Sequence, residues 1–465
     1  MVLRSFRGRG STATARSDTG EEQSLQAPIR TSLQPVVSDF SSRYTDLKVR
    51  LHQQLLDVIN LSALEKMRPQ DIRREVGSTI VDLLKTDVQT PLNLEQQNRI
   101  VSEVLDELTG LGPIEPLVKD TTTSDILVNT HGTVYVERNG KLELTEVRFK
   151  DDRHLMRIID KIVSSVGRRV DESTPMMDAR LKDGSRVNVI VPPLAVDGPI
   201  LSIRKFATIR PSIEALIEIG SITPEIAELL EAIIQAGLNV LISGGTGSGK
   251  TTLLNAVSRF IPDTDRIITI EDAAELQLQQ PHVVRLETRP PNLEGKGEIA
   301  QRDLLRNSLR MRPDRIILGE CRGAEAFDML QAMNTGHDGS LTTIHANSCR
   351  DALSRLEQMI AMAGFDIPIR SMRSQIASAL DVVIQLERMS DGRRYLTSLH
   401  EVTGMEGDII TMQEIFCFKR TGVDEKGNVL GEFRATGLRP KFMGELESKG
   451  VEVSSEIFSP DRALG

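Results

Sequence analysis

One run of residues has the composition and spacing of a phosphate-binding loop. Residues 244–251 read Gly-Gly-Thr-Gly-Ser-Gly-Lys-Thr and match the pattern G-x-x-x-x-G-K-[ST] at every fixed position. Glycines let the backbone wrap closely around phosphate, so that N–H groups and a helix N-terminus face the negative charge. Lys250 would reach the outer phosphates of a nucleotide, and Thr251 would offer its hydroxyl to Mg²⁺. The predicted nucleotide contacts are Gly244, Gly245, Thr246, Gly247, Ser248, Gly249, Lys250, Thr251 and Thr252.

Acidic residues end two other apolar segments that are predicted to be buried strands. Segment 315–318 leads to Glu320, and segment 266–270 leads to Glu271 and Asp272. The carboxyl ends of parallel strands meet at one edge of an open α/β sheet, and ligands bind there. We therefore expect these acids to lie beside the phosphate loop.

These acids could divide two tasks between them. We expect Glu271 to be the general base that polarises the attacking water, with Glu320 as the competing candidate. Thr251, Glu320 and Asp272 are the predicted Mg²⁺ contacts, directly or through water. Gly319 stands where a Walker B pattern commonly has an aspartate, which leaves Glu320 either a water-mediated metal contact or a water-orienting role. Asp272 could instead cap the turn that follows it.

Two histidines flank a short predicted strand at about residues 341–344. They are His337 and His345, in the run Gly-His-Asp-Gly-Ser to His-Ala-Asn. A neutral imidazole can sense a terminal phosphate or link it to a neighbouring subunit, whereas a histidine without such a setting is more often structural. From the residues alone, both readings stay open.

The phosphate loop needs a strand before it and a helix after it, and the sequence offers both. Segment 238–242 is apolar, and 252–260 has helical periodicity. From about residue 212 the pattern alternates between strand, loop and helix, which predicts an α/β domain with a mostly parallel sheet flanked by helices. Beyond about residue 404 the pattern is less regular.

Upstream of this domain the pattern is first helical and then strand-like. Leu47, Leu51 and Leu55 recur at four-residue steps, and helical patterns continue over 71–84 and 94–108. An α+β domain is expected next, with a helix at 153–166 and strands at 125–129, 133–137, 142–149, 178–181, 186–191 and 200–205. The predicted division is a disordered leader 1–43, a helical segment 44–112, the α+β domain 113–205, a linker 206–212, the ATPase-like domain 213–440 and a C-terminal tail 441–465.

Composition narrows the function classes. The chain has 465 residues and a formal net charge of −9, which argues against a general nucleic-acid coat. No apolar stretch approaches the roughly 18 residues that a membrane span needs. The three cysteines fit neither a zinc site nor a disulfide framework, so buried thiols are expected. The sequence predicts a cytoplasmic protein whose membrane contact comes through partners.

Taken in order, the motifs resemble those of the type II/type IV secretion ATPase superfamily. The phosphate loop and segments 268–272, 312–320 and 336–347 look like its Walker A, Asp box, Walker B and His box. Segments 178–186 and 286–297 resemble the CpaF branch, the ATPases of Flp (tight adherence) pili. The resemblance covers about residues 101–407.

The resemblance implies an architecture and an activity. The fold would be a RecA-like P-loop NTPase domain preceded by a PAS-like α+β domain and a helical segment. The protein would be an ATPase using ATP and Mg²⁺, working as a homohexamer on an inner-membrane platform protein. It would power pilus assembly or protein secretion from the cytoplasmic face, peripheral to the membrane and without direct nucleic-acid contact. A related DNA-transfer ATPase is the alternative.

The resemblance also implies roles for residues that spacing alone does not single out. Arg186 and Arg204 match arginines that reach the nucleotide across the interface between the two domains. His345, and with it His337, belong to the His box. Two further candidates for a contact in trans, which could equally pair with Asp314, are Arg310 and Arg312.

Overall fold

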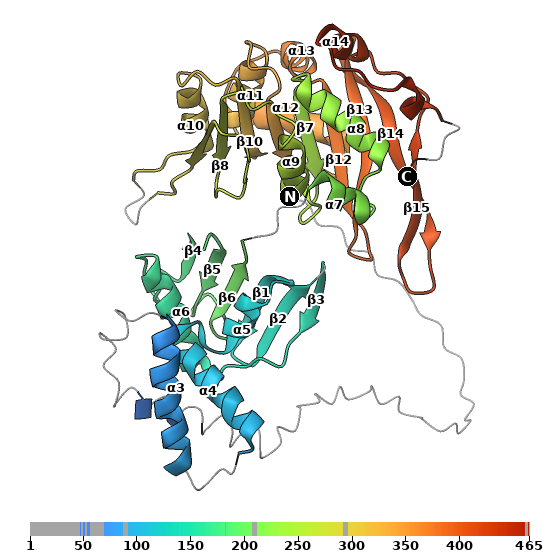
Figure 1. Ribbon diagram of the computed structural model, residues 1–465. Coiled ribbons are helices and arrows are strands. Elements are labelled where there is room, and N and C mark those ends of the chain that lie inside the picture. Colours follow the sequence, from blue (N-terminus) through green and yellow to red (C-terminus); the bar gives the residue numbers. More distant parts are fainter. Residues whose placement is uncertain are drawn as a thin grey trace, which may run out of the picture.

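The computed structural model places two β-sheets one above the other, with a helical segment below the smaller sheet (Figure 1). It describes residues 47, 50–51, 54–55, 69–86, 92–138, 140–181, 183–206, 212–291, 296–460 and 464. The expected leader 1–43 and residues 207–211 of the expected linker lie outside the described residues.

The helical segment forms a small hydrophobic cluster of its own. Leu47, Leu51 and Leu55 are buried there with residues of α3 and α4, as their spacing predicts. Asn93 caps α4 reciprocally with Gln96, which satisfies two backbone N–H groups at the helix start. The segment continues into two short helices that lead to the smaller sheet. The elements are α3 (Pro69–Thr86), α4 (Leu94–Thr109), η1 (Gly112–Ile114) and α5 (Glu115–Lys119).

The smaller sheet is antiparallel, with strand order β3-β2-β1-β6-β5-β4. Helix α6 (Asp152–Ser165) packs its apolar face into the core of this sheet, which confirms the α+β prediction. Its strands are β1 (Thr123–Thr130), β2 (Thr133–Arg138), β3 (Lys141–Leu144), β4 (Met176–Arg180), β5 (Arg186–Ile190) and β6 (Ile200–Arg204).

Strand β3 is shorter than predicted. It ends at Leu144, and all four of its residues are exposed because it is an edge strand. The expected continuation to Phe149 is wrong. Phe149 lies in the segment that turns back toward α6, where its N–H donates to the His131 carbonyl and its ring is buried.

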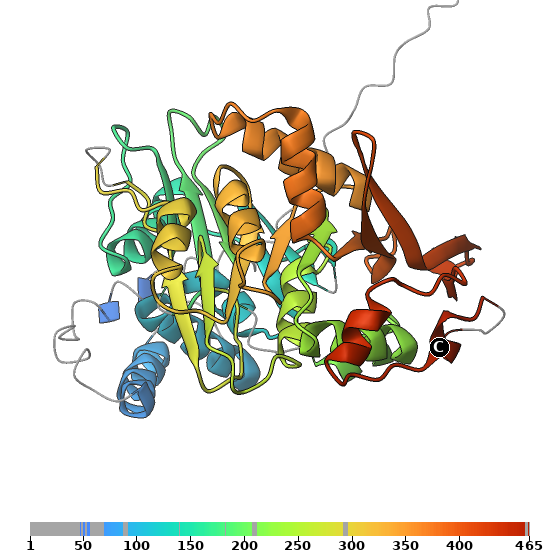
Figure 2. The same ribbon diagram turned by 90° about the horizontal axis from the view of Figure 1, so that it is seen from above.

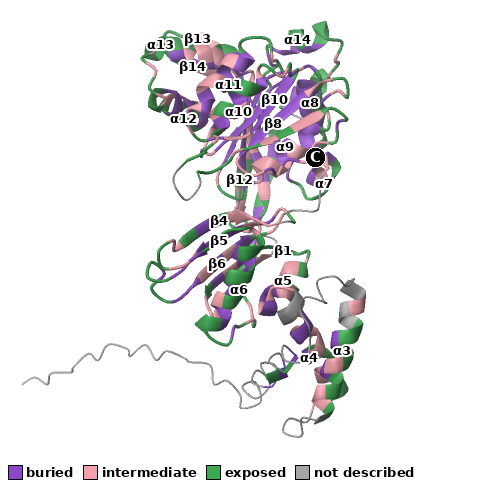
Figure 3. Cartoon of the chain, turned by 90° about the vertical axis from the view of Figure 1, so that its left-hand side faces the viewer, coloured by how far each residue is buried: buried purple, intermediate pink, exposed green. Residues whose placement is uncertain are grey.

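The larger sheet has nine strands in the order β15-β14-β13-β12-β7-β11-β10-β8-β9, and the six strands from β12 to β9 are parallel. This confirms the predicted α/β class. Helices cover both sides of these strands (Figure 2), and the strands between them are buried (Figure 3). The parallel strands are β7 (Val240–Gly244), β8 (Ile267–Glu271), β9 (Val283–Glu287), β10 (Arg315–Cys321), β11 (Leu341–Ile344) and β12 (Val382–Arg388).

The two helical layers belong to separate hydrophobic clusters. One holds the apolar faces of α7 (Ile213–Glu218), α8 (Pro224–Gln235) and α9 (Lys250–Ser258). Leu305 of a further helix lies in the other cluster with three more helices of the opposite layer. That layer comprises α10 (Gln301–Ser308), α11 (Glu325–Met333), α12 (Cys349–Met362) and α13 (Ile369–Ala379).

The chain beyond residue 404 is more regular than expected. It forms long antiparallel strands, β13 (Arg394–Glu406), β14 (Ile409–Val423) and β15 (Val429–Ala435), which extend the parallel sheet. Polar residues occupy many half-exposed positions of β14, so its apolar alternation is weak. The expected tail also packs down, since α14 (Met443–Ser448) and η2 (Ser455–Phe458) bury side chains in the core that contains α8.

The cysteines behave as predicted. All three are free thiols, and Cys321 and Cys349 are buried while Cys417 is half-buried. Burial raises the pKa of the Cys321 thiol to about 12, so it stays protonated. Over the described residues, no helix combines the length and apolar character that spanning a membrane requires.

Candidate active site

The phosphate loop leaves a central strand of the larger sheet. Strand β7 is buried along its whole length, and α9 begins at Lys250 directly after the loop. Gly247 and Gly249 have φ angles of 68° and 97°, which favour glycine at both positions. Lys250 Nζ donates to the carbonyls of Gly244 and Gly245 at 2.9 and 3.2 Å. The ammonium group therefore lies over the loop, within a cradle suited to phosphate.

Carboxylates from two adjacent strands lie beside this loop, as the strand register requires. Strands β8 and β10 are parallel neighbours; β8 ends at Glu271, and Glu320 is the second-last residue of β10. Glu320 Oε1 lies 4.0 Å from Lys250 Nζ. Its Oε2 accepts hydrogen bonds from Arg322, whose Nη1 is also 3.2 Å from Asp272 Oδ2. Arg322, which the sequence reading missed, thus joins both predicted metal-binding carboxylates.

Glu271 is held by the loop that follows its strand. It is 4% exposed, and its Oε1 accepts the backbone N–H groups of Glu275 and Leu276 at 2.8 and 2.9 Å. Its Oε2 is buried and has no hydrogen-bond partner in the described part of the chain. Burial raises the pKa of Glu271 to about 7, although the two backbone hydrogen bonds oppose the rise. The carboxylate therefore suits proton transfer near neutral pH.

The missing Walker B aspartate has a steric cause. A Cβ on Gly319 would lie 2.9 Å from Cγ of Glu271. Real Cβ atoms do not approach a neighbour so closely, and Glu271 is fixed at its far end by two N–H groups. Gly319 thus leaves room for Glu271, and the acidic residue at this end of β10 is Glu320, one residue further on.

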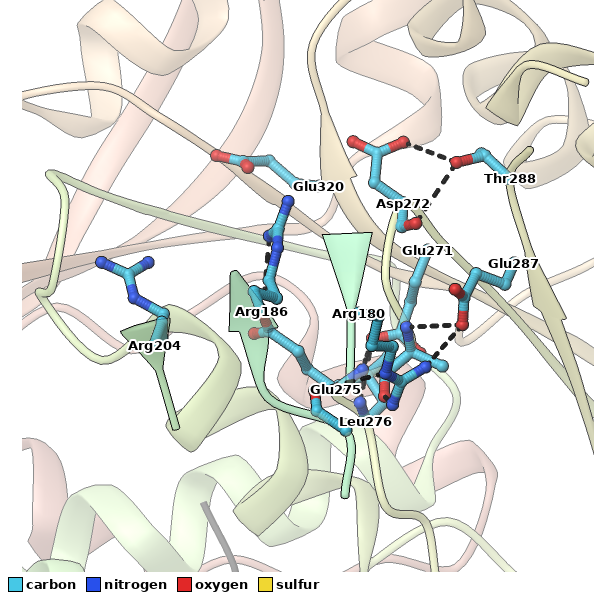
Figure 4. A network of polar contacts seen from close by, with 12 residues as sticks. Arg180, Arg186, Arg204, Glu271, Asp272, Glu275, Leu276, Glu287, Thr288 and Glu320 are labelled. Carbon is cyan, nitrogen blue, oxygen red and sulfur yellow. Dashed lines mark hydrogen bonds and ion pairs between the residues drawn. The ribbon is translucent and has the colours of Figure 1, made fainter. Parts of the chain in front are cut away.

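A cavity between the two sheets brings the phosphate loop and the smaller sheet together. It has a volume of about 450 Å³, and its lining includes Thr246, Thr251, Arg186 and Arg204. Arg186 Nη1 lies 3.6 Å from Oε1 of Glu275. Figure 4 shows Arg186 reaching from the smaller sheet toward Glu275, whereas Arg204 stands apart from the acids, with its Nε 3.0 Å from Oδ1 of Asp125 in its own sheet. The structure thus assembles side chains that lie far apart in sequence.

Two further arginines lie over the phosphate loop and were not expected. Arg394 Nε donates to the Gly247 carbonyl at 2.8 Å, and Arg388 lines the same cavity. Burial lowers the pKa of Arg394, and neighbouring Arg388 lowers it further. Glu137 of the smaller sheet lies 3.5 and 4.0 Å from the two guanidinium groups. They sit in the hairpin from β12 to β13, whose sequence has no phosphate-binding signature.

The two histidines lie at opposite edges of the larger sheet. His345 follows β11, where Ile344 pairs with Ser243 immediately before the phosphate loop. His337 precedes β11, so the strand carries the chain away from it. Its Nδ1 lies 3.2 Å from the Ala332 carbonyl at the end of α11. The two histidines therefore lie at opposite ends of β11, and a role for either of them in nucleotide chemistry stays a prediction.

The candidate trans arginines also lie at the amino edge, because they precede β10. Arg310 and Arg312 are exposed. Asp314, their expected alternative partner, instead accepts the Arg266 backbone N–H at 2.7 Å. A contact of these arginines in trans stays a prediction.

The donor set fits Mg²⁺ bound with a nucleotide. Thr251 lines the cavity, and Asp272 and Glu320 carry carboxylate oxygens, the hard ligands that Mg²⁺ prefers. Ser248 Oγ is buried and has no hydrogen-bond partner among the described residues, as expected of a phosphate cradle. Mg²⁺ is usually bound by one or two carboxylates together with phosphate oxygens, and Asp272 and Glu320 are two carboxylates.

Comparison with known proteins places this arrangement in a family. Residues 107–426 match the family described as Type II/IV secretion system protein, and the chain belongs to this family. A Mycobacterium tuberculosis protein described as a conjugal transfer protein is 39% identical over 309 residues, covering 65% of this chain and 87% of that protein. The type IV secretion system protein VirB11 of Bartonella henselae is 32% identical over 332 residues, covering 63% and 92%. The solved VirB11 ATPase of Brucella suis, in complex with sulphate, is 30% identical, with coverage of 62% and 95% and a TM-score of 0.34.

Proposed function

We propose that the chain hydrolyses ATP with Mg²⁺ and converts the reaction into movement of the smaller domain against a RecA-like domain. The observation that carries this proposal is the shared cavity, where Thr246 and Thr251 face Arg186 and Arg204. A guanidinium group can bind phosphate bidentately, so nucleotide in the cavity would draw the two domains together.

The proposed roles follow from position. Lys250 would leave the loop carbonyls for the outer phosphates, and Thr251, Asp272 and Glu320 would hold Mg²⁺ directly or through water. When bound, Mg²⁺ neutralises phosphate charge. Glu271 would take a proton from the attacking water, because its unpartnered Oε2 and raised pKa suit that task. Loss of the terminal phosphate would release the arginines and reopen the domains.

The proposed setting is a pilus or secretion machine of the Flp type. The CpaF-like segments support it, together with membership of the secretion family. In this proposal the chain forms a homohexamer at the cytoplasmic face of the inner membrane and moves a platform protein. The smaller domain, proposed to be PAS-like, supplies the moving part. A cyclic assembly would let neighbouring subunits act in turn.

A DNA-transfer ATPase is the second candidate, because relatives are described as conjugal transfer proteins. The net charge of −9 argues against an extended DNA path. Turnover of the full chain with and without duplex or single-stranded DNA separates the two. Strong stimulation by DNA would favour the transfer function.

The test of the ATPase proposal is phosphate release from Mg-ATP by the wild-type chain and by Lys250→Ala, with the mass of the assembly measured alongside. We expect steady turnover for the wild type and almost none for the variant. The fold of the variant should persist, because Lys250 donates hydrogen bonds to two loop carbonyls and its ion pair with Glu320 is long, at 4.0 Å. Wild-type turnover by Lys250→Ala would refute the site. Turnover that is constant per chain, without a ring, would refute the hexameric motor but not the hydrolase.

A further inference from the structure

The loop 272–276, which follows β8, is hydrogen-bonded to Arg180 of the smaller sheet. Arg180 Nη1 lies 2.6 Å from Oε2 of Glu287, and its Nη2 donates to the Ala274 carbonyl at 2.8 Å. The same Glu287 oxygen accepts the Ala274 N–H at 3.2 Å. Arg180 and Glu287, which lie side by side in Figure 4, thus hold both backbone polar groups of Ala274, and Arg285 of the larger sheet adds a longer hydrogen bond of 3.3 Å to the same carbonyl.

Arg180 moves with the smaller domain. Its Nε donates to the Gly184 carbonyl at 3.2 Å, in the turn between β4 and β5. Its guanidinium carbon lies 5.7 Å from the centre of the Phe206 ring. These contacts fix the side chain relative to its own sheet, so a displacement of that sheet displaces the hydrogen bond to Ala274.

The peptide unit whose carbonyl Arg180 binds also carries an N–H group that orients Glu271. The Ala274 carbonyl and the Glu275 N–H belong to one planar unit and point in opposite directions in the trans form. Arg180 binds the carbonyl, while the N–H donates to Glu271 Oε1 at 2.8 Å. A planar peptide transmits a tilt from one end to the other, so both hydrogen bonds shift together.

We propose that Arg180 is a positioning residue that ties the orientation of the Glu271 carboxylate to the position of the smaller domain through the peptide between Ala274 and Glu275. This inference rests on the proposed ATPase function, in which Glu271 is the general base. Domain movement would then switch the chemical step as well as nucleotide binding.

Loss of Arg186 and loss of Arg180 should affect different kinetic quantities. Arg186 lines the nucleotide cavity, so its loss should weaken nucleotide binding. Both arginines line a neighbouring cavity of about 260 Å³, but Arg180 is absent from the lining of the nucleotide cavity. Loss of Arg180 should therefore act on the rate of the bound complex.

The experiment compares full-length wild type with Arg180→Ala, Arg180→Lys, Glu287→Gln and the double variant Arg180→Ala/Glu287→Gln. The quantities measured are kcat, KM for ATP, the Kd of a fluorescent ADP analogue and Tm. Arg169→Ala is the matched control, because Arg169 is an exposed arginine that pairs with Asp171 at 2.5 Å within the smaller domain.

We expect Arg180→Ala to lower kcat about tenfold, the rate effect of one lost charge-assisted hydrogen bond, with KM and Kd within about twofold of wild type. Arg180→Lys should recover part of the rate, because one ammonium can engage either the carbonyl or the carboxylate. The double variant should be no slower than Arg180→Ala alone, since both changes release the same loop.

Unchanged kcat in Arg180→Ala would overturn the inference. Equal losses of kcat and of nucleotide affinity would also overturn it, because they would show that Arg180 only holds the two domains together. Multiplying effects in the double variant would also overturn it. A variant that fails to fold leaves the decision to Arg180→Lys and Glu287→Gln, which keep more of the packing. A wild-type chain that binds nucleotide but never hydrolyses it refutes the ATPase proposal instead.

Discussion

A single methyl group added at Gly319 should disable the site while leaving nucleotide binding intact. In Gly319→Ala the new Cβ would lie 2.9 Å from Cγ and 3.5 Å from Cβ of Glu271. Because Glu271 is buried and fixed by two backbone N–H groups, its side chain must move by a few tenths of an ångström to about 1 Å. Overpacking of this kind costs about 1–3 kcal/mol of stability, and a 1 Å misplacement of a catalytic group can cost about 100-fold in rate.

The assay measures kcat for ATP hydrolysis, the Kd of a fluorescent nucleotide and Tm for wild type, Gly319→Ala and Gly422→Ala. Gly422 is the matched control, since a Cβ there would meet nothing within 4 Å and it also lies in a strand. We expect Gly319→Ala to lose about 10- to 100-fold in kcat, with nucleotide affinity near wild type and a modest fall in Tm. Wild-type kcat in Gly319→Ala would refute the argument that Glu271 needs the space at this position.

Two further predictions use residues at the edges of the larger sheet. His345→Ala should lower kcat roughly tenfold, because His345 lies at the edge that carries the phosphate loop. His337→Ala should leave kcat unchanged, because His337 lies at the other edge. Equal losses of kcat in steady-state assays of the two variants would contradict this prediction. Burial raises the pKa of Asp381 to about 6. Between about pH 4 and pH 6 the folded state therefore keeps a carboxyl proton that the unfolded chain has lost. The free energy of unfolding falls as the pH rises through this range. Asp381→Asn should remove that loss and raise the free energy of unfolding by up to about 3 kcal/mol at pH 7. A Tm difference between variant and wild type that is the same at pH 5 and pH 7.5 would contradict this prediction.

Local signals in the sequence predicted the parts of the site that one segment supplies. The phosphate loop is contiguous, so glycine spacing defines Lys250 and Thr251 together with their strand and helix. The acids were also predictable, because the end of a buried parallel strand has only one edge of the sheet to reach. For the same reason His337 could have been separated from His345, since a single strand between them places them at opposite edges.

Contacts between distant segments were not predictable in this way. Arg388 and Arg394 reach the phosphate loop because β12 pairs with β7 and turns into β13, and that register leaves no local pattern. Arg322 offered one signal, its place two residues after Glu320, but its bridge to Asp272 depends on the pairing of β8 with β10. The clash at Gly319 likewise depends on a neighbouring strand. The resemblance named Arg186 and Arg204, but composition and periodicity did not.

The smaller domain touches the two halves of the site by different means, and this bears on how a motor could use them. On the phosphate side, Glu137 lies between Arg388 and Arg394, so this contact is an exchangeable ion pair over the loop. On the acid side, Arg180 is bonded to a backbone carbonyl that belongs to the same peptide as a hydrogen bond of Glu271. Ion pairs tolerate displacement, whereas a hydrogen bond weakens steeply with angle. A small rotation of the domain would therefore disturb the acid side before it released the phosphate side, so that hydrolysis would stop while nucleotide is still held.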